Sequence, residues 1–225
     1  MRILILFLLI PSVLLAQFYS PSYNGSVTKN SLYVNYDFSK SSSYPGSGTT
    51  VYSTTNNGLN ASLFNSPTFF SDPGYVRFLP GNSQYMLLGD LRNAYPPVSS
   101  STRSGIFTIS LWFNPTSANG IVLSDLNSTS ISGGYYTSDI EMVGGYLKFS
   151  VWPRTTYLTS AAVTLNAWHH VVLVYTGNSV RAYLDNALVG TATYTRIGPH
   201  MSSLTDSQYF CVAAYESSHM GAGVS

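Results

Sequence analysis

Three pairs of turn-forming residues in the second half of this chain leave few folds open to it. They are Gly-Gly at 144–145, Gly-Asn at 177–178 and Asp-Asn at 185–186. Each pair lies between two strand-like runs and supplies residues that tolerate the positive φ angles of a two-residue hairpin turn. The sequence therefore predicts antiparallel strands joined by tight turns, and counting outward from each turn fixes the register.

The first turn predicts a hairpin in which Glu141 faces Lys148 and Ile140 faces Phe149. Because successive strand residues point to opposite faces, the apolar members share one face and the charged members share the other. The next two turns build a three-stranded meander with a core face and a second, more mixed face. We expect the mixed face to carry His170, Val172, Val174, Arg181, Tyr183 and Leu188.

The rest of the chain continues this pattern, with short runs of Val, Ile, Leu, Tyr, Phe and Thr between Gly, Asn, Asp, Ser and Pro. Such a pattern is typical of an all-β sandwich or barrel. Segments 40–50 and 93–104, rich in Ser, Pro and Gly, are expected to be loops. Strands are predicted over residues 32–38, 61–64, 75–79, 84–88, 107–113, 120–124, 135–143, 146–152, 169–176, 179–184, 187–193 and 208–214.

Residues 1–16 have the pattern of a secretory signal peptide. Arg2 gives a positive start, residues 3–10 are apolar, and Ala16 supplies a small residue at the exit. The apolar run is shorter than the roughly 20 residues of a membrane span, and a buried first strand is the alternative. We therefore expect a signal peptide at 1–16, a flexible N-terminal arm at 17–30 and one domain at 31–225. The protein would then be secreted or displayed at the cell surface.

Charge and cysteine content exclude several classes of partner. The chain has 10 basic and 9 acidic residues, so the loss of Arg2 with the leader leaves 9 of each. A neutral chain lacks the basic patches that bind nucleic acids and anionic membranes, so we expect neither partner. No second apolar run is long enough to span a bilayer. Cys211 is the single cysteine. It predicts a small buried side chain, with intermolecular pairing as the alternative.

Several longer motifs resemble the laminin-G-like, concanavalin A-like family of lectins and glucanases. The family's strand that ends in Trp and a Pro-containing turn is similar to IFTISLWFNP at 106–115. Its Trp-His-His strand and Tyr-x-Asp hairpin are similar to AWHHVVLVY at 167–175 and VRAYLDN at 180–186. Its opening strands resemble VNYDF at 34–38 and VRFLPGNSQY at 76–85. The resemblance implies a two-sheet antiparallel β-sandwich, the concanavalin A-like jelly roll, and does not by itself fix a ligand.

One part of the family pattern is missing. Members continue past the strand that resembles residues 209–215 into a further strand that pairs near the N-terminal strand, whereas this sequence stops at Ser225. The resemblance thus predicts a sandwich that lacks its closing strand. Unpaired backbone groups at an open edge attract other strands. We therefore expect self-association there, or recruitment of the arm at 17–30.

The residues argue against catalysis. Glycosidases of this fold need two carboxylates flanking the scissile bond, and their Glu-x-Asp-x-x-Glu signature is absent. Asp139 and Glu141 are the one close acidic pair expected to share a strand face, but Glu141 should pair with Lys148 across the hairpin. His169 and His170 point to opposite faces of their strand and cannot hold one metal ion together. We predict that the protein is not an enzyme.

A binding surface is predicted on the strand faces that turn away from the core. Sugar sites combine an aromatic platform with polar groups. The first hairpin presents Tyr146, Lys148 and Trp152, and Arg181 and Tyr183 extend this platform if the hairpins join one sheet. A second buried layer is the alternative. We predict a recognition module for a glycan or an extracellular protein, with a structural or adhesive subunit as the second hypothesis and a glycoside hydrolase as the third.

Calcium is the one cofactor that the resemblance suggests. Family members hold it with Asp side chains and carbonyl oxygens at the rim of the sandwich, and oxygen ligands suit this ion. The candidate ligands are Asp125, which follows the run at 120–124, and Asp139, which precedes the Gly-Gly turn. Otherwise Asp125 forms a turn and Asp139 is a solvated strand residue.

Overall fold

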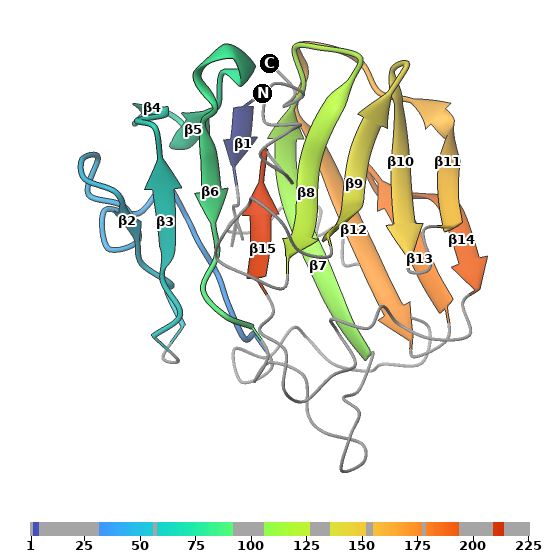
Figure 1. The fold of residues 1–225 in the computed structure, drawn as a ribbon, viewed down its shortest axis with the longest axis horizontal. Coiled ribbons are helices and arrows are strands. Elements are labelled where there is room, and N and C mark those ends of the chain that lie inside the picture. Colours follow the sequence, from blue (N-terminus) through green and yellow to red (C-terminus); the bar gives the residue numbers. More distant parts are fainter. Residues whose placement is uncertain are drawn as a thin grey trace, which may run out of the picture.

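The computed structural model describes residues 2–4, 32–55, 58–91, 106–126, 136–151, 155–176, 179–193 and 209–213. Within these ranges the chain forms two antiparallel sheets packed face to face (Figure 1). This confirms the prediction of an all-β, two-sheet antiparallel sandwich. No helix in these ranges is long and apolar enough to cross a membrane.

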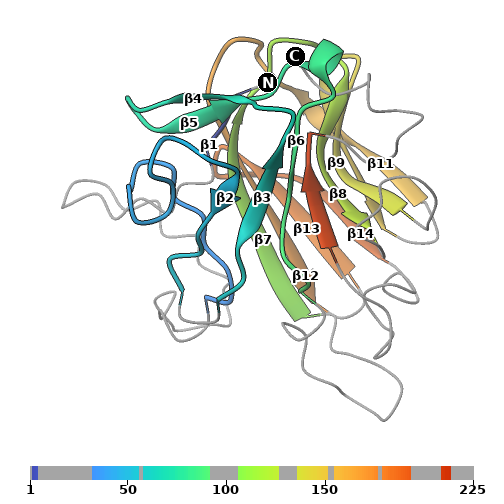
Figure 2. The same ribbon diagram turned by 60° about the vertical axis from the view of Figure 1, so that its left-hand side comes forward.

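The sandwich consists of one seven-stranded and one eight-stranded sheet, and Figures 1 and 2 show one lying over the other. In spatial order the seven-stranded sheet contains β14 (Ala187–Thr193), β13 (Ser179–Leu184), β12 (His169–Thr176), β7 (Ile106–Asn114), β1 (Arg2–Leu4), β5 (Tyr75–Arg77) and β4 (Thr68–Phe70). The eight-stranded sheet contains β11 (Thr155–Ala162), β10 (Tyr146–Val151), β9 (Tyr136–Val143), β8 (Gly120–Leu126), β15 (Tyr209–Val212), β6 (Tyr85–Leu87), β3 (Ala61–Phe64) and β2 (Thr50–Val51).

The predicted Gly-Gly hairpin is confirmed in its register. Strands β9 and β10 pair Glu141 with Lys148 and Ile140 with Phe149. Gly144 and Gly145 have φ angles of 60° and 84°, the left-handed region in which a side chain with a Cβ is strained. The glycines therefore set the turn, and the turn sets which residues of both strands enter the core.

The predicted meander is also confirmed. Tyr175 pairs with Val180, as a two-residue loop at 177–178 requires, although those two residues lie outside the described ranges. Strands β13 and β14 pair across the second turn, where Asp185 and Asn186 have φ angles of 49° and 73°. A register shift after Ala182 interrupts this second ladder. The shift adds one residue to β14 without moving the core face of β13.

Phe149 joins the two sheets across the core. It lies on β10 in the eight-stranded sheet and is 2% exposed. A Cβ built on Gly190 of β14, in the other sheet, would lie 2.5 Å from the Cζ atom of Phe149. Since real carbon atoms do not approach so closely, the ring packs into a space that exists only because residue 190 has no side chain.

Four strands were not predicted. β2 and β4 have two and three residues, and β1 lies within the predicted leader. β11 is the fourth, an eight-residue edge strand whose Thr, Ser and Ala side chains give a weak apolar pattern. Most other strands differ from their predicted ranges by one to three residues at an end, as is usual for strand ends.

The prediction of a strand at 32–38 is wrong. This segment is irregular, yet Asn35, Tyr36, Asp37 and Phe38 are buried. Its backbone groups bond to loops instead of to a neighbouring strand: the amide N–H of Asn35 donates to Oγ of Ser53 at 3.3 Å, and the carbonyl oxygen of Asn35 accepts the backbone N–H of Thr54 at 2.8 Å. Apolar burial thus holds this segment in place without a ladder.

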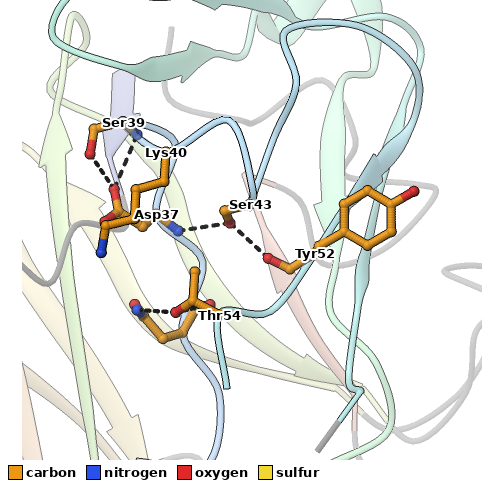
Figure 3. Close-up of polar contacts among 7 residues, drawn as sticks. Asp37, Ser39, Lys40, Ser43, Tyr52 and Thr54 are labelled. Atoms are coloured by element: carbon orange, nitrogen blue, oxygen red, sulfur yellow. Dashed lines mark hydrogen bonds and ion pairs between the residues drawn. The ribbon is translucent and has the colours of Figure 1, made fainter. Parts of the chain in front are cut away.

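The buried carboxylate of Asp37 fastens the loop that follows this segment (Figure 3). Its Oδ1 accepts hydrogen bonds from the backbone N–H and the hydroxyl of Ser39, at 3.0 and 2.6 Å. Its Oδ2 lies 3.1 Å from Nζ of Lys40. The Asp37 amide donates to Oγ of Ser43, whose hydroxyl donates to the carbonyl of Tyr52. These partners give Asp37 a structural role.

β15, the strand after which family members continue into their closing strand, is paired on both sides, with β8 and with β6. It is therefore not an edge strand of its sheet. β1, which falls within the leader that the sequence predicts, lies inside the seven-stranded sheet, antiparallel to both β5 and β7 (Figure 1). Removal of residues 1–16 stays a prediction, and it would take β1 away from between its neighbours.

We expect Gly190→Ala to destabilise the fold by about 1–3 kcal/mol, because the new methyl group overlaps the Phe149 ring and overpacks the core. Urea denaturation of the variant would measure this loss. The double variant Gly190→Ala with Phe149→Leu should recover part of the loss relative to Phe149→Leu alone, since leucine vacates the overlapped space. Strictly additive effects of the two changes would contradict this packing.

Candidate functional site

The mixed face predicted from the sequence is a continuous surface of the seven-stranded sheet. Register places Trp112 beside His170 on β7 and β12, and Tyr183 beside Leu188 on β13 and β14. All of these positions alternate with core residues, so they point away from the other sheet. The register adds two residues of β7, Ser110 and Trp112, to the six predicted ones, so that the mixed face comprises Ser110, Trp112, His170, Val172, Val174, Arg181, Tyr183 and Leu188.

Solvent reaches the mixed face at its outer strands. Arg181 is exposed and Leu188 is 56% exposed, whereas Trp112 and Tyr183 are half-buried and Val172 is buried. The surface therefore has an apolar floor at β12 and a polar and aromatic boundary. This combination of apolar area with a few directed polar groups is what small-molecule and sugar sites offer.

A stacked pair of rings forms the β7 side of this face. The ring centroids of Trp112 and His170 are 4.9 Å apart and the ring planes are 21° from parallel. Nε2 of His170 lies 2.8 Å from Oγ of Ser110, two residues before Trp112 on the same strand. The stack and the hydrogen bond together hold the imidazole in one orientation.

Burial lowers the pKa of His170 below its ordinary value of 6.5, and the nearby negative charge of Asp185 opposes this shift only in part. Removing an imidazolium from water is costly, so the neutral ring is favoured. A neutral His170 has one N–H donor and one acceptor nitrogen. It therefore brings a hydrogen-bonding group to the mixed face without adding a charge near pH 7.

His169, the preceding residue, points into the sandwich, which confirms that the two histidines cannot act on one ion. Its Nδ1 lies 2.7 Å from Oδ2 of Asp185 and its Nε2 lies 2.9 Å from the carbonyl oxygen of Thr164. Oδ1 of Asp185 accepts the backbone N–H of His170 at 2.8 Å. Asp185 thereby ties the β13–β14 turn to the start of β12.

The mixed face and the adjacent turn contain the residue types of a hydrolytic triad, in Ser110, His170 and Asp185. Their hydrogen bonds differ from those of a triad. In a triad one histidine contacts both the serine and the carboxylate. Here the Ser110 hydroxyl contacts His170, while the Asp185 carboxylate contacts the ring of His169 on the other face of the strand. These contacts hold both rings in place.

The structure separates the side chains that the sequence grouped as one binding platform. Arg181 and Tyr183 lie on β13 in the seven-stranded sheet, whereas Tyr146 and Lys148 lie on β10 in the eight-stranded sheet. The condition that both hairpins join one sheet is therefore not met, because the meander pairs with β7 and the first hairpin pairs with β8. Trp152 lies outside the described residues.

On the eight-stranded sheet, the predicted cross-strand ion pair is present. Nζ of Lys148 lies 3.5 Å from Oε2 of Glu141, and both side chains are about three-quarters buried. Tyr146 at the start of β10 is 42% exposed. The Glu141 carboxylate is thus engaged by a cation, which is ordinary sheet stabilisation.

The candidate calcium ligands lie on adjacent strands, Asp125 on β8 and Asp139 on β9. Their side chains are outside what the structure describes. Among the side chains that are described, no group of three or more His, Cys, Asp and Glu residues could hold a metal ion. Calcium binding at Asp125 and Asp139 stays a prediction.

The sequence analysis placed His170 on the mixed face, but it included neither Trp112 nor Ser110 there. The sequence shows the alternation that places Ser110 and Trp112 on one face of β7, but it does not show the register of β7 against β12.

Cys211 is buried with no exposed surface, which confirms the prediction of a small buried side chain.

Comparison with known families gives one match. The model of the concanavalin A-like lectin/glucanases superfamily matches residues 80–215, more than half of the chain. No curated protein matches the sequence. The matched range contains all four strands that carry the mixed face.

Several solved structures are similar to this chain. The binding domain of botulinum neurotoxin DC, solved in complex with rat synaptotagmin II, is 12% identical with a TM-score of 0.50, over 82% of this chain and 44% of that one. Domains LG4-5 of the mouse laminin alpha1 chain are 15% identical with a TM-score of 0.41, over 60% of this chain and 32% of that one. This chain thus spans less than half the length of either. At these identities the likeness concerns the fold alone.

His170 predicts a pH dependence of stability. Because its pKa is lowered in the folded state, the unfolded chain binds the proton first as the pH falls below about 6.5, and the free energy of unfolding decreases. We expect His170→Gln, which does not titrate, to lose less stability than the native protein between pH 7.5 and 5. Urea denaturation at several pH values would measure this. Equal losses in both proteins would contradict the inference.

Proposed function

Because the chain belongs to the concanavalin A-like lectin/glucanases superfamily, we propose that it is a secreted, non-catalytic recognition module that binds carbohydrate through the mixed face. The observation that supports this most is the fixed Trp112–His170 stack beside Ser110, Tyr183 and Arg181. Fold alone does not decide the ligand, so the proposal is based on this surface.

The surface suits a neutral sugar chemically. The apolar faces of sugar rings pack on aromatic and aliphatic side chains, here Trp112, Tyr183 and Leu188, and hydroxyl groups need both donors and acceptors. Ser110 and the neutral imidazole of His170 can serve as either, and Arg181 supplies donors only. A surface with one exposed cation and fixed rings is better matched to a neutral glycan than to a strongly anionic one.

An extracellular protein is the second candidate ligand, because Tyr, Trp and Arg are also the residues that dominate protein interfaces. The exposure of Leu188 favours this reading, since an isolated aliphatic side chain at 56% exposure is a contact that a protein partner would bury. Binding to isolated oligosaccharides distinguishes the two ligand classes.

A matched test uses Tyr183 and Tyr146, which the sequence grouped in one platform but which lie on different sheets. We expect Tyr183→Ala to weaken binding to oligosaccharides on a glycan array about tenfold or more, as loss of an important aromatic contact does. Tyr146→Ala, the same change on the other sheet, should leave binding unchanged. The reverse pattern would move the site to the eight-stranded sheet. No binding to any carbohydrate would reject the glycan as ligand.

Absence of catalysis is tested separately. The purified protein should release no reducing sugar from neutral polysaccharides, because Glu141 is paired with Lys148 and the two-carboxylate signature is missing from the sequence. Turnover that is lost in both Asp139→Asn and Glu141→Gln would overturn this part of the proposal, since it would identify the pair as the catalytic carboxylates.

A further inference from the structure

Beyond β1, the outward face of the seven-stranded sheet carries a second group of aromatic side chains. Val76 of β5 has no exposed surface and points into the core, so its neighbours Tyr75 and Arg77 point away from the other sheet. Phe70 of β4 pairs with Tyr75, and their rings are stacked, with centroids 4.6 Å apart and planes 11° from parallel. This stack lies on the same side of the sheet as the mixed face, with β1 between them (Figure 1).

Trp168 links this stack to β12. It lies just before that strand, two residues ahead of His170 of the mixed face. Its ring lies edge-on to the ring of Tyr75, with centroids 5.5 Å apart and an angle of 74° between the planes. This contact connects the stack to the strand that carries His170. We use the name Arg77 patch for the group formed by Phe70, Tyr75, Arg77 and Trp168.

The guanidinium group of Arg77 lies over the aromatic stack. Its Cζ atom is 5.2 Å from the centroid of the Phe70 ring, which is a cation–π distance. Nε of Arg77 is buried with no hydrogen-bond partner. In the part of the chain that the structure describes, Arg77 also forms no ion pair. The ring therefore holds the guanidinium in position but does not supply acceptors for its five N–H groups.

Arg77 differs in this respect from the other Lys and Arg side chains whose burial the structure describes. Nζ of Lys40 and Nζ of Lys148 lie 3.1 and 3.5 Å from carboxylate oxygens. Arg181 is exposed, so water solvates its charge. Among these side chains Arg77 alone is partly buried without an anion beside it. Because a guanidinium keeps its charge when water is withdrawn, this position favours the binding of an anion.

We propose that the Arg77 patch is a subsite for an acidic sugar residue at one end of the glycan that binds the mixed face. The anionic group is a carboxylate or a sulfate ester, because the planar guanidinium can pair with either oxyanion through two parallel N–H···O hydrogen bonds. The proposal rests on the proposed carbohydrate function. It adds a preference for one negative charge on a glycan that is otherwise neutral.

The aromatic members of the patch suit the sugar ring that carries the anion. Phe70 and Trp168 are each half-buried, so part of each ring is open to the apolar face of a sugar. Tyr75 is 7% exposed and packs against both rings, which fixes their positions. An oxyanion at Arg77 then lies beside rings that exclude water from one side. Its attraction to the guanidinium is therefore stronger than that of an ion pair in open solvent.

One oligosaccharide can reach both the Arg77 patch and the mixed face. Arg77 and Asn114 are in register with the same residue of β1, so their backbones lie two strand spacings apart, about 9.6 Å. Trp112 lies two residues from Asn114 along β7, about 6.8 Å. The backbone positions of Arg77 and Trp112 are therefore about 12 Å apart. An extended oligosaccharide of a few residues covers this distance.

The test compares matched pairs of oligosaccharides by isothermal titration calorimetry. Uronic acid oligosaccharides are paired with their methyl esters and sulfated ones with their unsulfated forms, so that each pair differs in charge and shares its sugar rings. We expect the acidic member of at least one kind of pair to bind about tenfold more tightly, which also identifies the anion. Arg77→Gln should bind both members equally. Arg181→Gln, which removes an arginine from the same sheet, should keep the ratio of the two affinities.

Salt dependence gives a second measurement that needs no variant. In the native protein, raising NaCl from about 0.05 to 0.5 M should lower the ratio of the two affinities severalfold, because salt screens a partly exposed ion pair. Equal binding of both members, a ratio that salt does not change, or a preference that survives Arg77→Gln would overturn the subsite and leave the proposed function in place. No binding to any oligosaccharide would reject the proposed function and the subsite together.

Discussion

The ladder between β7 and β12 is the constraint on which the rest of the structure depends. It pairs the strands from Phe113 and His169 at one end to Ile106 and Thr176 at the other. Because side chains alternate strictly, this register sends Phe113 and His169 into the core and their neighbours Trp112 and His170 outward. A slip by one residue would exchange the two sets, burying the mixed face and exposing the core. The same ladder that holds the sandwich together therefore creates the surface proposed for binding.

Packing between the sheets limits how that ladder can move. Phe149 of one sheet fills the space beside Gly190 of the other, so the sheets are matched to each other at a point close to the mixed face. Asp185 adds a polar restraint by binding the His169 ring and the His170 amide from the opposite turn. A surface supported in this way is pre-organised, which reduces the entropy that a ligand must otherwise lose to order its site.

The seven-stranded sheet also differs from the eight-stranded sheet in how it is completed. Every internal strand of the eight-stranded sheet comes from the region between Ala61 and Val212, whereas the seven-stranded sheet is bridged by β1, which Arg2–Leu4 form. The strands on the two sides of β1 are not hydrogen-bonded to each other, although both groups pack into the same core. One group is β4 and β5, and the other is β7, β12, β13 and β14. The continuity of this sheet therefore depends on β1, and the mixed face begins on the neighbouring strand β7, at Trp112.

The sequence determined the local geometry: turn residues and strand alternation were enough to pair Glu141 with Lys148, to separate His169 from His170 and to list most of the mixed face. These features are set by neighbours within one hairpin or one strand. The order of strands in each sheet was decided only by tertiary structure, because backbone hydrogen bonds carry no side-chain identity and any strand of suitable alternation can pair with another. Hence the platform of Tyr146 and Tyr183 was divided between two sheets, the segment at 32–38 was buried without a ladder, and the strand Arg2–Leu4 came to lie between β5 and β7.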